Sequence, residues 1–486
     1  MSKPPLKTSH EDRIPISRKL TYGMGALANN LLGAAIGMMS IVLITGLKMN
    51  PAVVGALMAI PRLTDALTDP LMGYISDHTK SRWGRRKPYI FAGAILSGVI
   101  FAFLWQLPAG HSESFYFWYF LGGSILFYLA YTVFATPWVA MGYELTPDYN
   151  ERTRLMGVAN FIGQFAWVAV PWFYAIMEND ALFEDAVAGA RGLAIAIGVF
   201  VAIVGVLPAL FCKERFKEAS ERGAVAKESP LEGLAKNALN FGKGFLITIR
   251  FPPFLKLCGA TFLVFNGFML VSAFSSYVII YYIFSGDQDL GAEYIGWFGT
   301  VSSISTFCVI FLVTWISTRI GKRQTFFLAT GVSIVGYGLK WFCYNPDHPN
   351  LLLLPAPLIA FGLGGLFTLM GSMVADVCDL DEIATGERRE GMFGSIFWWV
   401  VKLGMALALA LSGILLNATG FEVELEGDQT ERALLLMRVF DFLVPMVTSG
   451  IAIWIIATYR LTEEKALEVR NELERRRTTR VKNCSR

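Results

Sequence analysis

Long apolar segments recur along the whole chain, and they limit what it can fold into. A helix needs roughly 20 apolar residues to cross the hydrocarbon core of a bilayer. Twelve segments meet this requirement, at approximately 20–46, 51–76, 88–107, 115–143, 155–177, 191–212, 254–284, 292–317, 325–344, 351–375, 392–418 and 436–458. Only 17% of the 486 residues are charged, against about a quarter in an average soluble domain. The sequence therefore predicts an all-α polytopic membrane protein with twelve transmembrane helices.

The basic residues predict how the chain is oriented. With a cytoplasmic N-terminus, 34 of the 42 Lys and Arg residues fall in the tails and connections on the cytoplasmic side, as the positive-inside rule requires. The opposite face carries Lys48, Arg191, Arg432 and Arg438. We expect an integral protein of the cytoplasmic (inner) membrane with both termini in the cytoplasm. The polar N-terminus does not resemble a secretory signal.

The longest polar interruption divides the predicted helices into six and six. We expect a cytoplasmic N-terminal tail (1–19), an N-terminal six-helix bundle (20–212), a cytoplasmic central loop (213–250), a C-terminal six-helix bundle (251–458) and a basic cytoplasmic C-terminal tail (459–486). The connection after the second helix of each half carries a similar motif, "RWGRR" at 82–86 and "RIGKR" at 319–323. Two parallel six-helix repeats resemble the major facilitator architecture.

The second predicted helix carries three charges on one face. Arg62, Asp65 and Asp69 stand at i, i+3 and i+7, a spacing that aligns them along a helix. A charge at the bilayer centre costs about 2.5–3.5 kcal/mol on insertion scales, so this face must turn to a cavity or to partner charges. Two carboxylates one turn apart, with Thr68 between them, can bind a small alkali cation or share a proton. An ion-pair cluster that only joins helices is the alternative.

Four stretches resemble one transporter family. They are "DALTDPLMGYISDHTKSRWGRRKP" (65–88), "YGMGALANNLL" (22–32), "YTVFATPW" (131–138) and "ADVCDLDEIATGERREGMFGSIFWWVVKLG" (375–404). In order and over most of the chain, they are similar to the glycoside-pentoside-hexuronide:cation symporter family of the major facilitator superfamily, which includes melibiose permease. The resemblance implies an alkali cation site at Asp65 and Asp69, with Thr68 and Thr132 beside it.

Two basic residues are predicted to act in coupling. Arg62 limits the excess negative charge of the second helix, and Lys402 matches the family's lysine on the eleventh helix. Lys402 is the single charged residue between Gly391 and Gly420, so its ammonium needs an acidic partner or should lose its proton. A lysine that snorkels to the interface or packs between helices is the alternative.

The substrate contacts are predicted from polar and aromatic residues, because the family's sugar-binding acids are absent. Residues 26–28 and Ala135 stand where the family has those acids, and Asn160 stands where it has an arginine. Aromatic faces and amides suit sugar rings and hydroxyls. The candidates are Asn29, Asn30, Tyr128, Trp138, Asn160, Gln164, Trp167, Asn266, Trp398 and Trp399. Each could equally be a packing or interface residue.

Charged residues at the cytoplasmic ends of the helices predict an inner gate of ion pairs. We expect Asp77 to face Arg82, Arg85 or Arg86, and Glu144 to cluster with Arg152 and Arg154. The corresponding residues of the second half are Arg319, Arg323, Asp376 and Asp379, with Asp381, Arg388 and Arg389 nearby. Ordinary solvated surface charge is the alternative.

Together these features predict a secondary active transporter that couples a cation, Na+ or H+, to the symport of a sugar-like solute (a glycoside, oligosaccharide or uronide) by alternating access. A lysolipid or other amphiphile transporter of the same fold is the alternative, ahead of a non-transporting sensor or a membrane enzyme.

The four histidines lie in loops or tails and no GxxxxGK[ST] phosphate loop is present, so we expect no enzyme activity and no cofactor. The scattered cysteines do not form a metal or disulfide pattern. We expect a monomer in the lipid bilayer that binds a small molecule and no nucleic acid.

Overall fold

The computed structural model describes residues 13–79, 81–108, 110–146, 149–214, 248, 250–385 and 390–459, with parts of 461–475. The side chains of 16 of these, including Asp65 and Asp77, lie outside what it describes. The predicted loop 213–250 and the two tails therefore fall largely outside the described residues, as do Arg388 and Arg389. All regular structure among the described residues is helical.

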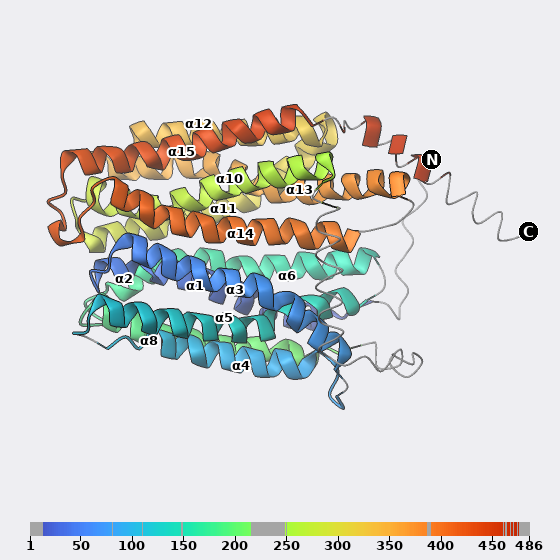
Figure 1. The fold of residues 1–486 in the computed structure, drawn as a ribbon, viewed down its shortest axis with the longest axis horizontal. Helices are drawn as coiled ribbons and strands as arrows, with labels where there is room; N and C mark the ends of the chain where they lie inside the picture. Colours follow the sequence, from blue (N-terminus) through green and yellow to red (C-terminus); the bar gives the residue numbers. More distant parts are fainter. Residues whose placement is uncertain are drawn as a thin grey trace, which may run out of the picture. The chain divides into compact units, whose positions relative to one another are not determined.

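The described residues separate into two compact units. The first contains α1 (Ile16–Met39), α2 (Ile41–Thr45), α3 (Pro51–His78), α4 (Lys87–Leu104), α5 (Glu113–Glu144), α6 (Tyr149–Ala169), η2 (Val170–Trp172), α7 (Phe173–Met177) and α8 (Ala186–Phe211). The second contains α10 (Pro252–Tyr277), the π-helical η4 (Val278–Ile283), α12 (Lys322–Cys343), η5 (Pro349–Leu353), α13 (Pro355–Thr385), α14 (Glu390–Ala418), η6 (Val423–Leu425) and α15 (Glu431–Ala457). The helix α11 (Gln288–Ile320) is divided between them, with Gln288–Thr300 in the first unit. Figure 1 shows the helices in sequence colours.

Every predicted span coincides with a helix of the structure. Eleven helical segments of the described chain are long and apolar enough to cross a membrane, and the apolar part of α3, Pro51–Thr64, makes a shorter twelfth. The all-α, twelve-helix prediction is confirmed. The largest difference is at α13, which continues to Thr385 because hydropathy marks the hydrocarbon layer and not the helix that projects beyond it.

Glycines allow helices of the first unit to approach closely. The helices α4 and α8 lie side by side and pack extensively (Figure 1). At their crossing a Cβ atom added to Gly98 would overlap the backbone carbonyl of Gly198, and the reverse substitution would overlap that of Gly98. A Cβ at Gly93 would likewise overlap the backbone of Phe134 on α5. The absence of side chains at these positions therefore sets the spacing of the first unit.

The core of the second unit is a cluster of apolar side chains from several helices. The helix α10 packs on α14 and α15, while α12 packs on α13 and α15. Phe254, Phe326, Met370 and Phe393 are at most 1% exposed within this cluster. The edge of the Phe254 ring meets the face of Phe393 at a centroid distance of 4.9 Å, an arrangement that the aromatic quadrupole favours.

The close approach of α4 and α8 gives a stability prediction. Gly98→Ala forces the two backbones apart, and overpacking of this kind costs about 1–3 kcal/mol. We expect a lower unfolding temperature in detergent, measured by intrinsic fluorescence. Gly122→Ala is the matched control, because a Cβ at Gly122 on α5 meets no atom within 4 Å. Equal unfolding temperatures for the two variants would contradict the packing argument.

Candidate functional site

The carboxylate of Asp69 on α3 is met by two hydroxyls from α5. Thr132 donates a hydrogen bond of 3.3 Å and Thr136 one of 3.1 Å, both to Asp69 Oδ1. The Thr132 hydroxyl also lies 3.3 Å from that of Thr68 on α3. A threonine that donates its proton to a carboxylate keeps lone pairs that can bind a cation. These four residues bring together one charged and three neutral oxygen ligand groups, a set that suits a hard cation.

Thr136 is absent from the residues predicted from the sequence. It stands four positions after Thr132 in "YTVFATPW", so the two hydroxyls share one face of α5. This spacing in the sequence could have indicated that Thr136 belongs to the same site as Thr132. Asp65 lies one turn before Asp69 on α3, which runs as a continuous helix through Pro61 and Pro70. Its side chain is outside the described part of the structure, so its role in the cation site stays a prediction.

Arg62 connects α3 to both neighbouring helices. Its Nη2 donates a 2.9 Å hydrogen bond to the carbonyl of Gly33 on α1. Its guanidinium carbon lies 4.9 Å from the ring centroid of Tyr128 on α5, which is buried. A cation over an aromatic face is attracted by the ring quadrupole. Arg62 and Tyr128, predicted for coupling and for substrate binding, are thus in contact with each other.

The substrate candidates of the first unit differ in what they contact. Tyr131 donates a 2.9 Å hydrogen bond to the side chain of Asn29, and Asn30 donates one of 3.1 Å to the carbonyl of Gly163 on α6. Trp138 is 7% exposed and donates to the carbonyl of Tyr22 at 3.2 Å. These contacts of Asn30 and Trp138 join helices. The α6 candidates are less enclosed, since Asn160 and Trp167 are exposed and Gln164 is half-buried.

The candidates of the second unit lie on α10 and α14. Asn266 donates a 2.7 Å hydrogen bond to the carbonyl of Phe262 in its own helix. Trp398 is 56% exposed and stacks on Phe367 at a centroid distance of 5.9 Å. Trp399 and Lys402 are both partly buried. These positions leave the predicted roles of the four residues untested.

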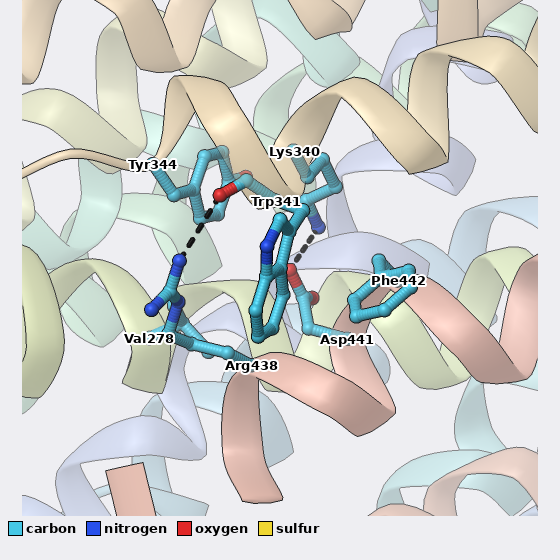
Figure 2. Close-up of a pocket in the computed structure, with 7 residues that line it drawn as sticks. All are labelled: Val278, Lys340, Trp341, Tyr344, Arg438, Asp441 and Phe442. Carbon is cyan, nitrogen blue, oxygen red and sulfur yellow. Dashed lines mark hydrogen bonds and ion pairs between the residues drawn. The ribbon is translucent and has the colours of Figure 1, made fainter. Parts of the chain in front are cut away.

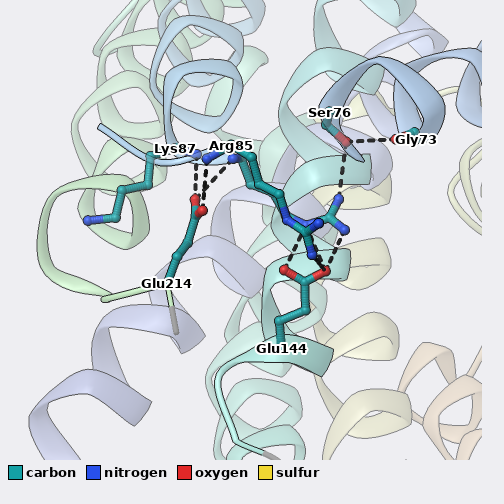
Figure 3. A network of polar contacts seen from close by, with 7 residues as sticks. Gly73, Ser76, Arg85, Lys87, Glu144 and Glu214 are labelled. Atoms are coloured by element: carbon teal, nitrogen blue, oxygen red, sulfur yellow. Dashed lines mark hydrogen bonds and ion pairs between the residues drawn. The ribbon is translucent and has the colours of Figure 1, made fainter. Parts of the chain in front are cut away.

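A charge cluster at one end of the first unit involves two arginines of the repeated loop motif. Figure 3 shows the carboxylate of Glu144, the last residue of α5, with dashed lines to the guanidinium nitrogens that it contacts. Its Oε1 lies 2.7 Å from Arg85 Nη2 and 2.5 Å from Arg86 Nη2. Arg86, which is 4% exposed, also donates to Ser76 Oγ of α3 at 3.1 Å. Charge-assisted pairs of this kind are stronger than neutral hydrogen bonds.

A second carboxylate fixes the loop that carries these arginines. Glu214, just after α8, accepts hydrogen bonds from the backbone N–H groups of Arg85 (2.9 Å), Arg86 (3.0 Å) and Lys87 (3.0 Å). Lys87 is the first residue of α4, Arg86 is its N-cap and Arg85 precedes it. The N–H groups at a helix start and the helix dipole favour an anion at this place. Gly84 has φ +120°, and a Cβ there would lie 2.8 Å from the Glu214 carboxylate. The motif therefore requires glycine at this position.

The second unit repeats this arrangement with different residues. Gly321 has φ +88° and precedes α12. Lys322, the next residue, lies 2.6 Å from Asp376 Oδ2 on α13, and Arg323 donates to the carbonyl of Ala457 at 2.5 Å. In each half the loop after the second helix is thus bound to an acid of the fourth helix and to the end of the sixth. The weak sequence repeat corresponds to a repeated set of contacts.

The remaining gate candidates are distributed around these clusters. The predicted cluster of Glu144 with Arg152 and Arg154 is not present: Glu144 is paired with Arg85 and Arg86, Arg154 lies 3.3 Å from Glu151 Oε2, and Arg152 donates to the carbonyl of Thr146 at 3.1 Å. Asp77 could not be placed, because its side chain lies outside the described part, and Arg82 is exposed. Arg319 lies over the ring of Trp315 at 5.4 Å. Asp376 and Asp379 line a cavity of about 760 Å³ beside Lys322 and Glu464.

Among the acids that the structure describes at this end of the first unit, Glu151 is the most enclosed. It lies outside the apolar spans and is 1% exposed. Burial by itself would raise its pKa, but Lys19 at 2.6 Å, the N–H of Ile14 at 2.9 Å and Arg154 outweigh burial and hold the pKa of Glu151 below its usual value. This contact is not predicted from the sequence. Ile14 and Lys19 precede the first predicted span, 20–46, and they bind an acid in the first turn of α6.

The lowered pKa of Glu151 gives a pH prediction. A carboxyl whose folded pKa lies below its unfolded value adds stability above the unfolded value, and this stability is lost as pH falls through the folded pKa. The unfolding temperature of the parent should therefore fall as pH is lowered from neutrality to below 4.5, the ordinary value for glutamate. Glu151→Gln should lower stability at neutral pH and flatten this dependence. Glu424→Gln, at an exposed position, is the control, and equal slopes for both variants would contradict the prediction.

The helical fold and the polar groups within its spans define an integral membrane transporter of the major facilitator type. Similar solved structures include a bacterial homolog of the human lysosomal transporter Spinster (TM-score 0.66, 15% identity, 95% of this chain and 99% of that chain). Another is a D-xylose-proton symporter (TM-score 0.60, 12% identity, 91% of this chain and 96% of that chain). At these identities the likeness shows the fold alone.

The chain belongs to the family described as MFS/sugar transport protein, whose model matches residues 21–463. This confirms the glycoside-pentoside-hexuronide:cation symporter family predicted from the motifs. Similar curated proteins include the isoprimeverose transporter of Lactiplantibacillus pentosus (22% identity, 94% of this chain and 91% of that protein). The glucuronide carrier protein homolog of Escherichia coli strain K12 is 24% identical over 94% of this chain and 95% of that protein. The sodium-dependent lysophosphatidylcholine symporter 1 of Xenopus tropicalis is 21% identical over 97% and 92%.

Proposed function

We propose that this protein is a cation-coupled symporter that moves a sugar-like solute by alternating access. The observation that carries the proposal is the Asp69 carboxylate within a membrane helix, with the hydroxyls of Thr132 and Thr136 donating to it. A carboxylate within a membrane span is costly, and such residues generally mark an ion or proton path. Lys402 and Arg62 are the proposed coupling residues. Relatives named as glycoside and glucuronide carriers support a sugar-like solute.

Na+ is the coupling ion that the geometry favours. The hydroxyls of Thr132 and Thr136 donate to the Asp69 carboxylate, and the Thr68 hydroxyl lies 3.3 Å from that of Thr132. Neutral oxygens complete the coordination of a metal cation, whereas a bound proton needs only one acceptor. Proton coupling is the alternative, and it predicts a response to pH in place of Na+. We propose that the protein lies in the cytoplasmic membrane with both termini in the cytoplasm, as its Lys and Arg distribution indicates. We also propose that it is a monomer.

A lysolipid or similar amphiphile is the second candidate solute. It is favoured by alanines at the positions where the resemblance places sugar-binding acids, and one relative is named a lysophosphatidylcholine symporter. Counterflow into proteoliposomes with a panel of glycosides, uronides and lysophospholipids separates the two. Saturable uptake of a glycoside or uronide supports the sugar-like solute, and uptake restricted to lysophospholipids supports the alternative.

Removal of the Asp69 charge tests the cation site without knowledge of the solute. A ligand that binds the folded state raises stability in proportion to ln(1 + [ligand]/Kd). We expect Na+, and not K+, to raise the unfolding temperature of the purified parent. Asp69→Asn should abolish this rise, because the amide lacks the charge. An equal rise in the parent and in Asp69→Asn would remove the proposed site, and a parent that responds only to pH would indicate proton coupling.

Thr136 gives a graded test of the same site. Thr136→Val removes a hydroxyl and keeps the shape, and hydrogen bonds to charged groups contribute about 1.5–3 kcal/mol. We expect the Na+ concentration for half-maximal stabilisation to rise about tenfold or more, since about 1.4 kcal/mol corresponds to tenfold in affinity. Thr314→Val is the control, because Thr314 is exposed on α11 and donates only within its own helix. Unchanged Na+ dependence in Thr136→Val would show that Thr136 is not a ligand.

A further inference from the structure

The second unit contains an enclosed ion pair that the cation site does not use. Lys340 on α12 and Asp441 on α15 meet at 2.5 Å, with side chains 1% and 2% exposed. Ser275 on α10 accepts from Lys340 Nζ at 2.6 Å and donates to Asp441 Oδ1 at 2.8 Å. Figure 2 shows Lys340 and Asp441 pointing toward each other. Both oxygens of Asp441 are therefore bonded, and its charge is balanced by Lys340.

Arg438 lies one turn before Asp441 on α15 but pairs with no carboxylate among the described residues. Its guanidinium carbon lies 4.1 Å from the ring centroid of Tyr282 and 4.4 Å from that of Trp341. Its Nη2 donates to the carbonyl of Trp341 at 3.0 Å. Carboxylates three residues away on a helix are natural partners of arginine, but Lys340 already binds this one. The cluster of Lys340, Arg438 and Asp441 thus carries one net positive charge.

A small cavity adjoins this cluster. It measures about 10 Å³, roughly the space of one water-sized group. Its walls are Val278, Lys340, Trp341, Tyr344, Arg438, Asp441 and Phe442. The Tyr344 hydroxyl is buried and has no described hydrogen-bond partner within 3.5 Å. The cavity is therefore lined by Tyr344, whose hydroxyl proton has no described acceptor within 3.5 Å, and by Arg438, whose guanidinium lies close to two aromatic rings. Arginine presents its N–H donors in the plane of the guanidinium.

The position of the cluster points to the membrane interface. Arg438 is seven residues after the start of α15 and Lys340 three before the end of α12, which places them about 10 Å and about 5 Å from the helix ends. Trp and Tyr side chains are enriched at this depth. On α12 the exposed side chains Leu328 (41%), Val335 (58%) and Phe342 (73%) recur every seven residues. They form an apolar stripe along one helix face, and its last residue, Phe342, follows Trp341 in the sequence.

We propose that this cluster binds the phosphate of an anionic phospholipid headgroup. The guanidinium of Arg438 meets two phosphate oxygens, a geometry for which arginine is suited. One oxygen enters the cavity toward Tyr344, while the acyl chains follow the apolar stripe of Leu328, Val335 and Phe342. Lys340 is a positioning residue: by occupying Asp441 it keeps Arg438 available. The stripe favours a lipid over free inorganic phosphate, because inorganic phosphate has no apolar part that could contact it.

Lipid retention tests the site. The parent and its variants, purified in mild detergent and incubated with equal amounts of phosphatidylglycerol and phosphatidylcholine, are compared by native mass spectrometry. We expect the parent to retain phosphatidylglycerol selectively, Arg438→Gln to retain about tenfold less, and Arg438→Lys an intermediate amount. Arg432→Gln is the matched control, because it removes one positive charge from an exposed position near the start of the same helix. It should behave as the parent.

Two further measurements keep the proposal falsifiable if Arg438→Gln folds poorly. Tyr344→Phe removes only the hydroxyl and should reduce selective retention about twofold to fivefold. Inorganic phosphate, added at concentrations up to the millimolar range, should neither displace the lipid nor raise the unfolding temperature. Equal retention by Arg438→Gln, Tyr344→Phe and the parent would overturn the site. Stabilisation by inorganic phosphate equal to that by phosphatidylglycerol would overturn the lipid as its occupant.

Discussion

Each charged side chain inside the apolar spans needs partner groups that offset the cost of removing it from water. This requirement determines most of the polar contacts described above. Asp69 receives threonine hydroxyls, whereas Asp441 receives the ammonium of Lys340. A hydroxyl that donates to a carboxylate still has lone pairs, but an ammonium has none. Asp69 therefore lies among neutral groups that can join it in binding a metal ion, whereas the charge of Asp441 is already balanced by Lys340. Two acids within the spans, with different partners, are suited to different roles.

The same requirement, applied at the helix ends, produces the repeated loop contacts. In the first half Arg85 and Arg86 share Glu144 while Glu214 accepts from the loop backbone. In the second half a lysine takes the position of the first arginine and pairs with Asp376. The glycine is common to both because it adopts a positive φ in each loop, a conformation that other residues adopt only with strain. The loops of the two halves therefore share the same glycine and its positive φ, whereas the side chains that follow it differ.

The membrane-spanning helices could be predicted well from the sequence, and the contacts between side chains less well. Spans follow from hydropathy because the bilayer acts on each helix separately, and the loop motifs were found because their glycines and arginines are adjacent in the sequence. The partners of those arginines were not found, because Glu144 and Glu214 are far away along the chain and many acids were available. Thr136 was missed for a different reason: a threonine in an apolar helix normally bonds its own backbone, and only the position of α3 against α5 brings it to Asp69. Lys340 and Asp441 stand in different predicted spans, 325–344 and 436–458, and no sequence spacing connects them.

The alanines at 26 and 28 show how helix packing restricts the choice of solute. Ala26 is 5% exposed and Ala28 is fully buried, and Cβ atoms added to Gly163 and Gly205 would come within 3.3 Å and 3.6 Å of the two methyl groups. A carboxylate at either position would have to displace α6 or α8, so these acids could not be restored by substitution alone. Polar groups on this part of α1 are then Asn29 and Asn30, and Asn30 is committed to the carbonyl of Gly163. Recognition on α1 would therefore depend on the amide of Asn29 and its partner Tyr131. Such neutral groups bind hydroxyls without selecting for charge, so any preference for an anionic sugar has to come from a basic residue elsewhere.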